Sequence, residues 1–219
     1  MRAQLQNLMN AASPYPSLLA PFTLAGRQLK NRVVHASMTT RHCANMRVTD
    51  RLIQYHANRA RGGAAMIVTE PLSMARHQNL PGKVRVWNDE NVEGLERWAA
   101  AVNEHGSLLL GQIQDAGRGR HADGRHVDAV GASVLPDDIS WSVPHALSVA
   151  EIESMIADFA QSSARLKRCG FAGVEISAGH GHMFHQFLSP RSNVRTDQYG
   201  GDWPNRTRLL TELIAAIRA

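Results

Sequence analysis

The sequence predicts an α/β fold, specifically about half of an eight-stranded (β/α)8 barrel. Short apolar runs alternate with amphipathic helical patterns, which is typical of β-α-β units around a parallel sheet. Four such units fill nearly all of the 219 residues, whereas a complete barrel takes about 250 residues. We therefore expect residues 1–219 to form a single domain that holds the first four units of a barrel.

Turn and capping residues mark the first two units. Gly26 lies between two short apolar runs and predicts a hairpin before the first strand. Thr49 is a typical helix-start residue, and the Gly62-Gly63 pair stops a helix. The predicted elements of this half are a hairpin over Phe22–Lys30, a strand over Arg32–Met38, a helix over Arg51–Arg61, a strand over Ala65–Glu70 and a loop over Pro71–Trp87.

Helical periodicity marks the other two units. Leu95, Ala99 and Val102 share one helix face, and Gly106 ends that helix. The S-x-x-E spacing of Ser148 to Glu151 predicts a capping box at the start of the next helix. The predicted elements of this half are a helix over Asp89–His105, a strand over Leu108–Ile113, a loop over Asp115–Leu147, a helix from Ser148 to Gly170, a strand over Phe171–Ser177 and a helix from about Asn205.

The composition is that of an ordinary globular protein, with 43% hydrophobic and 20% charged residues. No apolar run approaches the roughly 18 residues that a membrane-spanning helix needs. Residues Met1–Leu5 lack the apolar run of a secretory signal, and two cysteines cannot form a disulfide framework. We therefore expect a cytoplasmic protein that is not inserted in a membrane.

The formal charge of +5 raises the alternative of nucleic-acid binding. One Gly/Arg-rich run, Gly117–His126, supports that alternative, but the remaining positive charge is scattered along the chain. The sequence also lacks a zinc-finger spacing and the aromatic motif of an RNA-binding sheet. We favour a solvated loop and expect no nucleic-acid partner.

Functional residues of such a barrel collect at the carboxyl ends of its strands. Polar side chains follow all four predicted strands, and their convergence predicts a small-molecule site. The four strand ends are Ser37–Thr40, Glu70-Pro71, Gln112–Asp115 and Ser177–His182.

Several motifs along the chain resemble those of a known family. They are Leu29–Thr39, Tyr55–Gly63, Gln112 with Gly117-Arg118, Gly170–Ile176, Gln186–Pro190, Asn193, Arg195–Asp197, Tyr199–Gly201 and Asn205-Arg206. Together they resemble the old yellow enzyme (NADH:flavin oxidoreductase) family, in that family's order, from about residue 18 to the end. The resemblance implies the N-terminal half of an FMN-binding TIM barrel.

The resemblance also implies the cofactors and a cofactor site. The family binds FMN and passes hydride from NAD(P)H through the flavin to an activated alkene or a related small acceptor. By motif position, Ser37, Met38 and Thr39 would lie along the isoalloxazine ring, with the Thr39 hydroxyl donating to a flavin carbonyl. Gln112 would bind the pyrimidine edge, since an amide both donates and accepts. The alternative is that Thr39 and Gln112 are ordinary polar residues at strand ends.

Three positions near this site depart from the family pattern. Ser37 stands where proline is usual, Pro71 where a small residue is usual, and Asp115 where histidine is expected. Pro71 has no backbone N–H, so a flavin contact through that amide is lost. Related enzymes carry an iron–sulfur cluster after the barrel, so the resemblance implies such a cluster only in a region beyond residue 219.

The largest departure follows the fourth strand. The family has His-x-x-His or His-x-x-Asn there, which polarises the substrate's oxygen, and two residues later a tyrosine that delivers a proton. This chain has Ser177, His180 and His182 in those places. We expect Ser177, with its shorter reach, and His180 to hold the substrate. Our hypothesis is that His182 delivers the proton only while protonated, so that turnover declines through neutral pH; a packed or loop histidine is the alternative.

Two other classes of function stay open. A metal-dependent hydrolase would use His180 and His182, because histidines at i and i+2 of a strand share a face and could bind a divalent ion that activates water. A non-catalytic barrel fragment would instead bind a partner through the open edges of its sheet, and the same edges favour a homo-oligomer.

Overall fold

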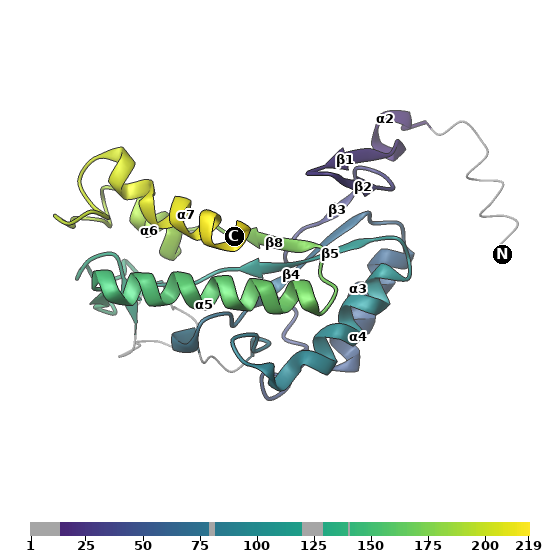
Figure 1. Ribbon diagram of the computed structural model, residues 1–219, viewed down its shortest axis with the longest axis horizontal. Coiled ribbons are helices and arrows are strands. Elements are labelled where there is room, and N and C mark those ends of the chain that lie inside the picture. Colours follow the sequence, from purple (N-terminus) through teal and green to yellow (C-terminus); the bar gives the residue numbers. More distant parts are fainter. Residues whose placement is uncertain (1–13, 79–81, 120–128, 140) are drawn as a thin grey trace, which may run out of the picture.

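The computed structural model describes residues 14–78, 82–119, 129–139 and 141–219, and a parallel sheet lies at its centre (Figure 1). Its four strands neighbour one another in chain order, and every pairing is parallel. The strands are β3 (Val34–His35), β4 (Met66–Leu72), β5 (Leu108–Ile113) and β8 (Gly173–Ile176). This arrangement confirms the predicted series of β-α units and forms an open part of an α/β barrel.

Amphipathic helices follow the strands and pack in pairs. They are α3 (Asp50–Arg61), α4 (Val92–Asn103), α5 (Val149–Arg168) and α7 (Trp203–Arg218). Helix α3 packs on α4, and α5 packs on α7. Figure 1 shows α3, α4 and α5 along one side of the sheet. The predicted apolar faces are buried in one continuous core, which includes Leu95, Phe159 and Leu213.

The helix ends follow the capping residues in the sequence. The Thr49 hydroxyl accepts a hydrogen bond from the Leu52 amide, and Ser148 and Glu151 form both halves of the predicted capping box. Helix α7 begins at Trp203, close to the predicted start at about Asn205, because the Asp202 carboxylate caps it by accepting a hydrogen bond from the Asn205 amide at 3.1 Å.

The first strand is shorter than the predicted Arg32–Met38, and only two of its residues pair with β4. Asn31 Oδ1 accepts a hydrogen bond from the Val33 amide at 2.9 Å, so this amide cannot donate to a neighbouring strand. Beyond His35 the chain crosses the ends of β4 and β5, where the Thr40 amide donates to Glu70. Side-chain hydrogen bonds therefore limit β3 at both ends.

The second strand is longer than predicted and continues through Pro71 to Leu72. A register shift between Val68 and Pro71 accommodates the proline. There the Thr69 hydroxyl accepts from the Gln112 amide at 3.1 Å and donates to the Glu70 carbonyl at 2.8 Å. A threonine side chain thus replaces a ladder bond at the irregular point.

Several short elements lie where loops were predicted. They are the 3-10 turn η1 (Arg76–Gln78), the paired strands β6 (Val130–Gly131) and β7 (His145–Ala146), and α6 (Met183–Leu188). Two further short elements lie elsewhere: α2 (Pro16–Leu19) precedes the predicted hairpin, and the 3-10 turn η2 (Asp89–Asn91) forms the first turn of the helix predicted over Asp89–His105. The predicted hairpin is present as β1 (Phe22–Leu24) and β2 (Arg27–Leu29), at the opposite end of the sheet from α6 (Figure 1). Directly after it, the Lys30 ammonium donates to the His105 carbonyl at 2.8 Å and to the Ser107 hydroxyl at 3.0 Å, which ties this hairpin to the end of α4.

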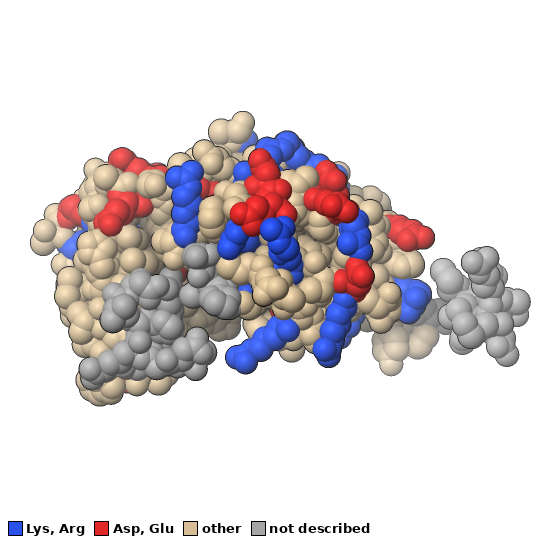
Figure 2. All heavy atoms as spheres, turned by 90° about the horizontal axis from the view of Figure 1, so that it is seen from below, with Lys and Arg blue, Asp and Glu red and all other residues tan. Residues whose placement is uncertain are grey.

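Charges of both signs are interspersed over the face shown in Figure 2. Several charged side chains of the described residues form ion pairs, such as Arg165 with Asp89 at 2.5 Å and Arg85 with Glu90 at 2.8 Å. Part of the Gly/Arg-rich run, from residue 120 onward, lies outside the described residues. Within the described residues, no helix is long and apolar enough to cross a membrane.

Candidate functional site

The carboxyl ends of the four strands bring together side chains that are far apart in the sequence. The Ser37 hydroxyl, after β3, donates to Gln112 Oε1 at 2.9 Å. Gln112 Nε2 in turn donates to Glu175 Oε1 of β8 at 2.8 Å. Pro71 of β4 lies beside Gln112 in the strand register. Three of the five predicted cofactor residues are therefore grouped around one buried amide.

The other two predicted cofactor residues lie beside this group and are exposed. Met38 is 58% exposed, and Thr39 is also exposed. The next residue, Thr40, donates from its amide and its hydroxyl to Glu70 Oε2, at 2.5 and 2.8 Å. These bonds fix the chain direction just beyond Thr39.

Glu70 was predicted only as one of the strand-end residues, and Glu175 only as part of a strand, and neither had a role in the predicted site. Glu70 is 2% exposed, and its second oxygen, Oε1, is buried without a hydrogen-bond partner. Glu175 accepts the Gln112 amide. An acidic residue inside or at the end of a half-buried strand is the signal that could have identified both.

The predicted catalytic residues follow β8 but do not continue it as a strand. The Ser177 amide donates to the Ile113 carbonyl at 2.9 Å, and β8 has already ended at Ile176. His180 lies in a turn with a left-handed φ of 61°, and His182 is the N-cap residue of α6. The imidazole rings of His180 and His182 are 5.9 Å apart.

A second glutamine contacts His182. Gln114 Nε2 lies 2.9 Å from Nδ1 and 3.4 Å from Nε2 of the His182 ring. The Lys83 ammonium donates to Gln114 Oε1 at 2.9 Å, which directs the amide nitrogen toward the histidine. Gln114 is a further site residue that the sequence reasoning did not single out.

The premise of the metal-hydrolase alternative is wrong, because His180 lies in a turn and His182 is the N-cap residue of α6, so neither is on a strand. Nδ1 of His185 accepts the Gly181 amide at 3.0 Å. No group of three or more His, Cys, Asp or Glu side chains suited to a metal ion occurs among the described residues. The geometry therefore does not favour a metal centre.

Asp115, at the position where histidine was expected, joins two loops. It is buried and accepts from the Gln78 side chain at 2.8 Å and from the Gly117 amide at 2.7 Å. Its Oδ2 lies 2.5 Å from Nε2 of His77. A histidine is thus present beside this position, but it comes from the η1 turn.

Asn193 and Arg195, which belong to the family motifs, connect the segment after α6 to neighbouring parts of the chain. The Arg195 guanidinium donates to the Ala132 carbonyl at 2.9 Å and the Leu147 carbonyl at 2.5 Å, and it pairs with Asp197. This guanidinium lowers the pKa of the Asp197 carboxyl below its ordinary value. The Asn193 amide group bridges the Phe187 and Tyr199 carbonyls, both at 2.7 Å. These contacts hold the segment after α6 against its neighbours and connect it to Phe187 of α6.

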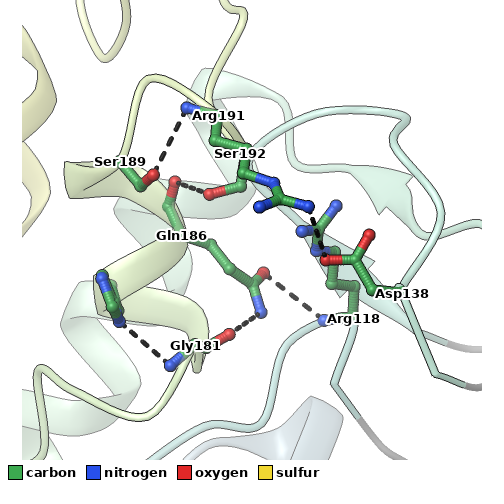
Figure 3. A pocket seen from close by; sticks show the side chains of 8 residues that line it. Arg118, Asp138, Gly181, Gln186, Ser189, Arg191 and Ser192 are labelled. Atoms are coloured by element: carbon green, nitrogen blue, oxygen red, sulfur yellow. Dashed lines mark hydrogen bonds and ion pairs between the residues drawn. The ribbon is translucent and has the colours of Figure 1, made fainter.

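A cavity of about 160 Å³ adjoins that turn (Figure 3). The residues that line it are Arg118, Asp138, Gly181, His185, Gln186, Ser189, Arg191 and Ser192. Most of its polar groups bind one another. Arg191 lies 3.4 Å from Asp138, the Ser192 hydroxyl donates to the Gln186 carbonyl, and the Gln186 amide donates to the Gly181 carbonyl (Figure 3).

A parallel α/β barrel sheet with polar groups gathered at its carboxyl edge defines the class of TIM-barrel proteins with a small-molecule site. The chain belongs to the NADH:flavin oxidoreductase / NADH oxidase family, whose model matches residues 17–219. This confirms the resemblance seen in the sequence. The family is one of flavin-dependent oxidoreductases.

Individual relatives match nearly the whole chain. It is 37% identical over 201 residues to a metal reductase of Desulforamulus reducens, a match that covers 92% of this chain and 30% of that protein. It is 35% identical over 204 residues to an NADPH dehydrogenase of Bacillus cytotoxicus, covering 92% and 58%. The chain therefore spans less than two thirds of the length of these relatives.

Solved structures agree with the fold. A 2-naphthoyl-CoA reductase in complex with 2-naphthoyl-CoA superposes with a TM-score of 0.84 at 29% identity, over 93% of this chain and 33% of that one. Morphinone reductase in complex with tetrahydroNAD superposes with a TM-score of 0.81 at 30% identity, over 92% and 60%.

Proposed function

We propose that this chain is the N-terminal half of the barrel of an FMN-dependent oxidoreductase that reduces an activated alkene or a related small acceptor with NAD(P)H. We further propose that residues 1–219 form one domain of that protein. Family membership over residues 17–219 supports this function, as do relatives named NADPH dehydrogenase. The chemistry that bound FMN supplies is hydride transfer from NAD(P)H to the acceptor.

The observation that carries the proposal is the environment of Gln112. An amide has two N–H donors and two acceptor lone pairs, and Ser37 and Glu175 occupy one of each. One donor and one acceptor therefore remain, which suits the pyrimidine edge of a flavin. The exposed Met38 and Thr39 beside them suit contact with a planar ring, and Pro71 would add apolar surface without an amide donor. The residues present thus fit FMN.

The residues after β8 would act on the acceptor. Ser177 and His180 would donate hydrogen bonds to its oxygen, which withdraws electrons from the alkene as hydride arrives. His182 would deliver the proton. Its ring contacts the Gln114 side chain, and its centroid lies 5.9 Å from that of the His180 ring. These roles come from motif position, and we propose them together with the function.

We also propose a cytoplasmic location and a small molecule as the substrate. The free thiols of Cys43 and Cys169 are consistent with a reducing compartment. The outer edges of β3 and β8 have no strand partner within the described residues, so they are available for the rest of a barrel or for a second copy of the chain.

Anaerobic reduction tests the function. Protein expressed from the complete reading frame and loaded with FMN is mixed with NADPH or NADH, and flavin absorbance is followed before and after an α,β-unsaturated ketone is added. We expect NADPH or NADH to bleach the flavin absorbance and the ketone to restore it. Absence of bleaching with both nucleotides contradicts the proposal, and bleaching without recovery contradicts the choice of acceptor.

A further inference from the structure

We propose that Ser37 and Glu175 are positioning residues that fix the Gln112 amide in one of its two orientations. This inference rests on the proposed function, because the oriented amide is the group that would bind the flavin's pyrimidine edge. It concerns the contacts of these two side chains with Gln112, which for Ser37 come in addition to the place along the isoalloxazine ring that the resemblance implies.

The chemistry of the three side chains allows one arrangement. The Glu175 carboxylate, when ionised, only accepts hydrogen bonds, so the group 2.8 Å away must be the Gln112 NH2. The Gln112 carbonyl oxygen then faces Ser37, and the Ser37 hydroxyl must donate to it over 2.9 Å. Turning the amide over would place its oxygen against the carboxylate, which no hydrogen bond could stabilise.

The backbone holds the same glutamine in place. The Gln112 amide N–H donates to the Thr69 hydroxyl at 3.1 Å at the irregular point of β4, and Gln112 pairs with Glu175 in the register of β5 and β8. Gln112 is only 8% exposed, so its unused N–H and lone pair have little access to water. A buried amide with a fixed direction discriminates between ligands, because a mismatched ligand leaves these groups unpaired.

Ser37 has a specific place in this arrangement. The resemblance placed it where the family usually has proline, and a proline side chain has no hydroxyl to donate. This chain therefore uses a serine hydroxyl to orient the glutamine, whereas a proline there would leave the orientation to Glu175 alone. The departure from the family pattern has a structural consequence at the flavin edge.

Flavin binding tests the proposal. The apoprotein from the complete reading frame is titrated with FMN and with an FMN analogue methylated at the pyrimidine N3, for the wild type, Ser37→Ala and Glu175→Gln. We expect the wild type to prefer FMN by about tenfold, and both variants to lose most of that preference, since a free amide can turn away from the methyl group. Glu153→Gln, the same chemical change on the exposed face of α5, is the control and keeps the preference.

The outcomes separate the two claims. Failure of the wild type to bind FMN overturns the proposed function, whereas a full preference in both variants overturns the positioning role. The positioning role is also measured without flavin, from the side-chain amide resonances of Gln112 in ¹⁵N-labelled protein. One strongly downfield proton that shifts in Glu175→Gln supports it, and unchanged resonances overturn it.

Discussion

His77 and Asp115 join the loops that follow β4 and β5, with Nε2 of His77 2.5 Å from Oδ2 of Asp115. Asp115 is 1% exposed and also accepts from the Gly117 amide and the Gln78 side chain. Its main-chain carbonyl accepts from the Met183 amide at the start of α6. One buried carboxylate thus connects both loops, and its residue reaches the helix that follows His182.

The first prediction concerns this carboxylate. Asp115→Ala leaves the buried Gly117 amide without its acceptor, and we expect it to lower the free energy of unfolding by about 1–3 kcal/mol. Chemical denaturation measures this. His77→Gln, which can still donate from a half-exposed position, serves as the control and should lose under 1 kcal/mol. Equal stability of Asp115→Ala and wild type would contradict a connecting role.

The second prediction compares adjacent glycines in the Tyr199–Gly201 motif. A Cβ at Gly200 would overlap the Arg195 carbonyl oxygen and lie 2.5 Å from the Arg195 Cβ. A Cβ at Gly201 meets nothing within 4 Å, but its φ of 83° is strained for alanine. We expect Gly200→Ala to cost about 3 kcal/mol through overpacking and Gly201→Ala about 1 kcal/mol. Thermal unfolding of the two variants checks the order, and the reverse order is the contradictory result.

The third prediction is a pH dependence of stability that arises from His56 in α3. His56 is fully buried, its Nδ1 bonds the Leu52 carbonyl, and burial lowers its pKa to about 4. Between pH 4 and the unfolded-state pKa of about 6.5, the unfolded chain binds a proton that the folded chain does not. His56 therefore costs stability as the pH falls through this window, by about 2 kcal/mol between pH 7 and pH 5.

Denaturation at pH 7 and pH 5 measures this loss. His56→Phe removes the titrating group, so the difference between the two pH values should shrink by that amount even if the variant is less stable overall. His105→Gln, a change at a more exposed histidine, should keep the wild-type difference. If His56→Phe loses as much free energy of unfolding between pH 7 and pH 5 as the wild type does, the pH dependence arises from other groups.

The fourth prediction concerns the proposed proton donor. If the His182 imidazolium delivers the proton, turnover falls as the pH rises through neutrality. His182→Tyr supplies a phenol with an ordinary pKa near 10, so its rate should stay level to about pH 9. Among the described residues, His180 lies close to His182, and Gln114 connects His182 to the Lys83 ammonium. Identical pH–rate profiles for wild type and His182→Tyr would remove His182 from that role.

Much of the fold could be predicted from the sequence because its signals are local. The alternation of apolar runs and amphipathic helices gave four parallel strands in order, and the Ser148–Glu151 spacing gave a capping box. The extent of β3 and β4 could not be predicted in this way. It depends on two side chains. Asn31 Oδ1 accepts a hydrogen bond from the Val33 amide, and the Thr69 hydroxyl accepts one from the Gln112 amide, so neither amide donates to a main-chain carbonyl of a neighbouring strand.

The site was predicted in its parts but not in its pairings. Ser37 and Gln112 were both expected near the flavin, yet their mutual hydrogen bond joins residues 75 positions apart. Glu175 was predicted only as part of a strand, although it accepts a hydrogen bond from the side-chain amide of Gln112. The pairing of Gln112 with Glu175 follows from the register of β5 and β8, whereas the bond from Ser37 depends on the path of the chain beyond β3. Both join segments that are far apart in the sequence.

The most direct test of the central claim, that these strand ends form part of an FMN site, is the visible absorption spectrum of the protein purified from its complete reading frame, before and after equilibration with FMN. We expect a protein-bound oxidised-flavin spectrum that persists through gel filtration and weakens in Gln112→Leu. A colourless protein that retains no flavin after equilibration would contradict it.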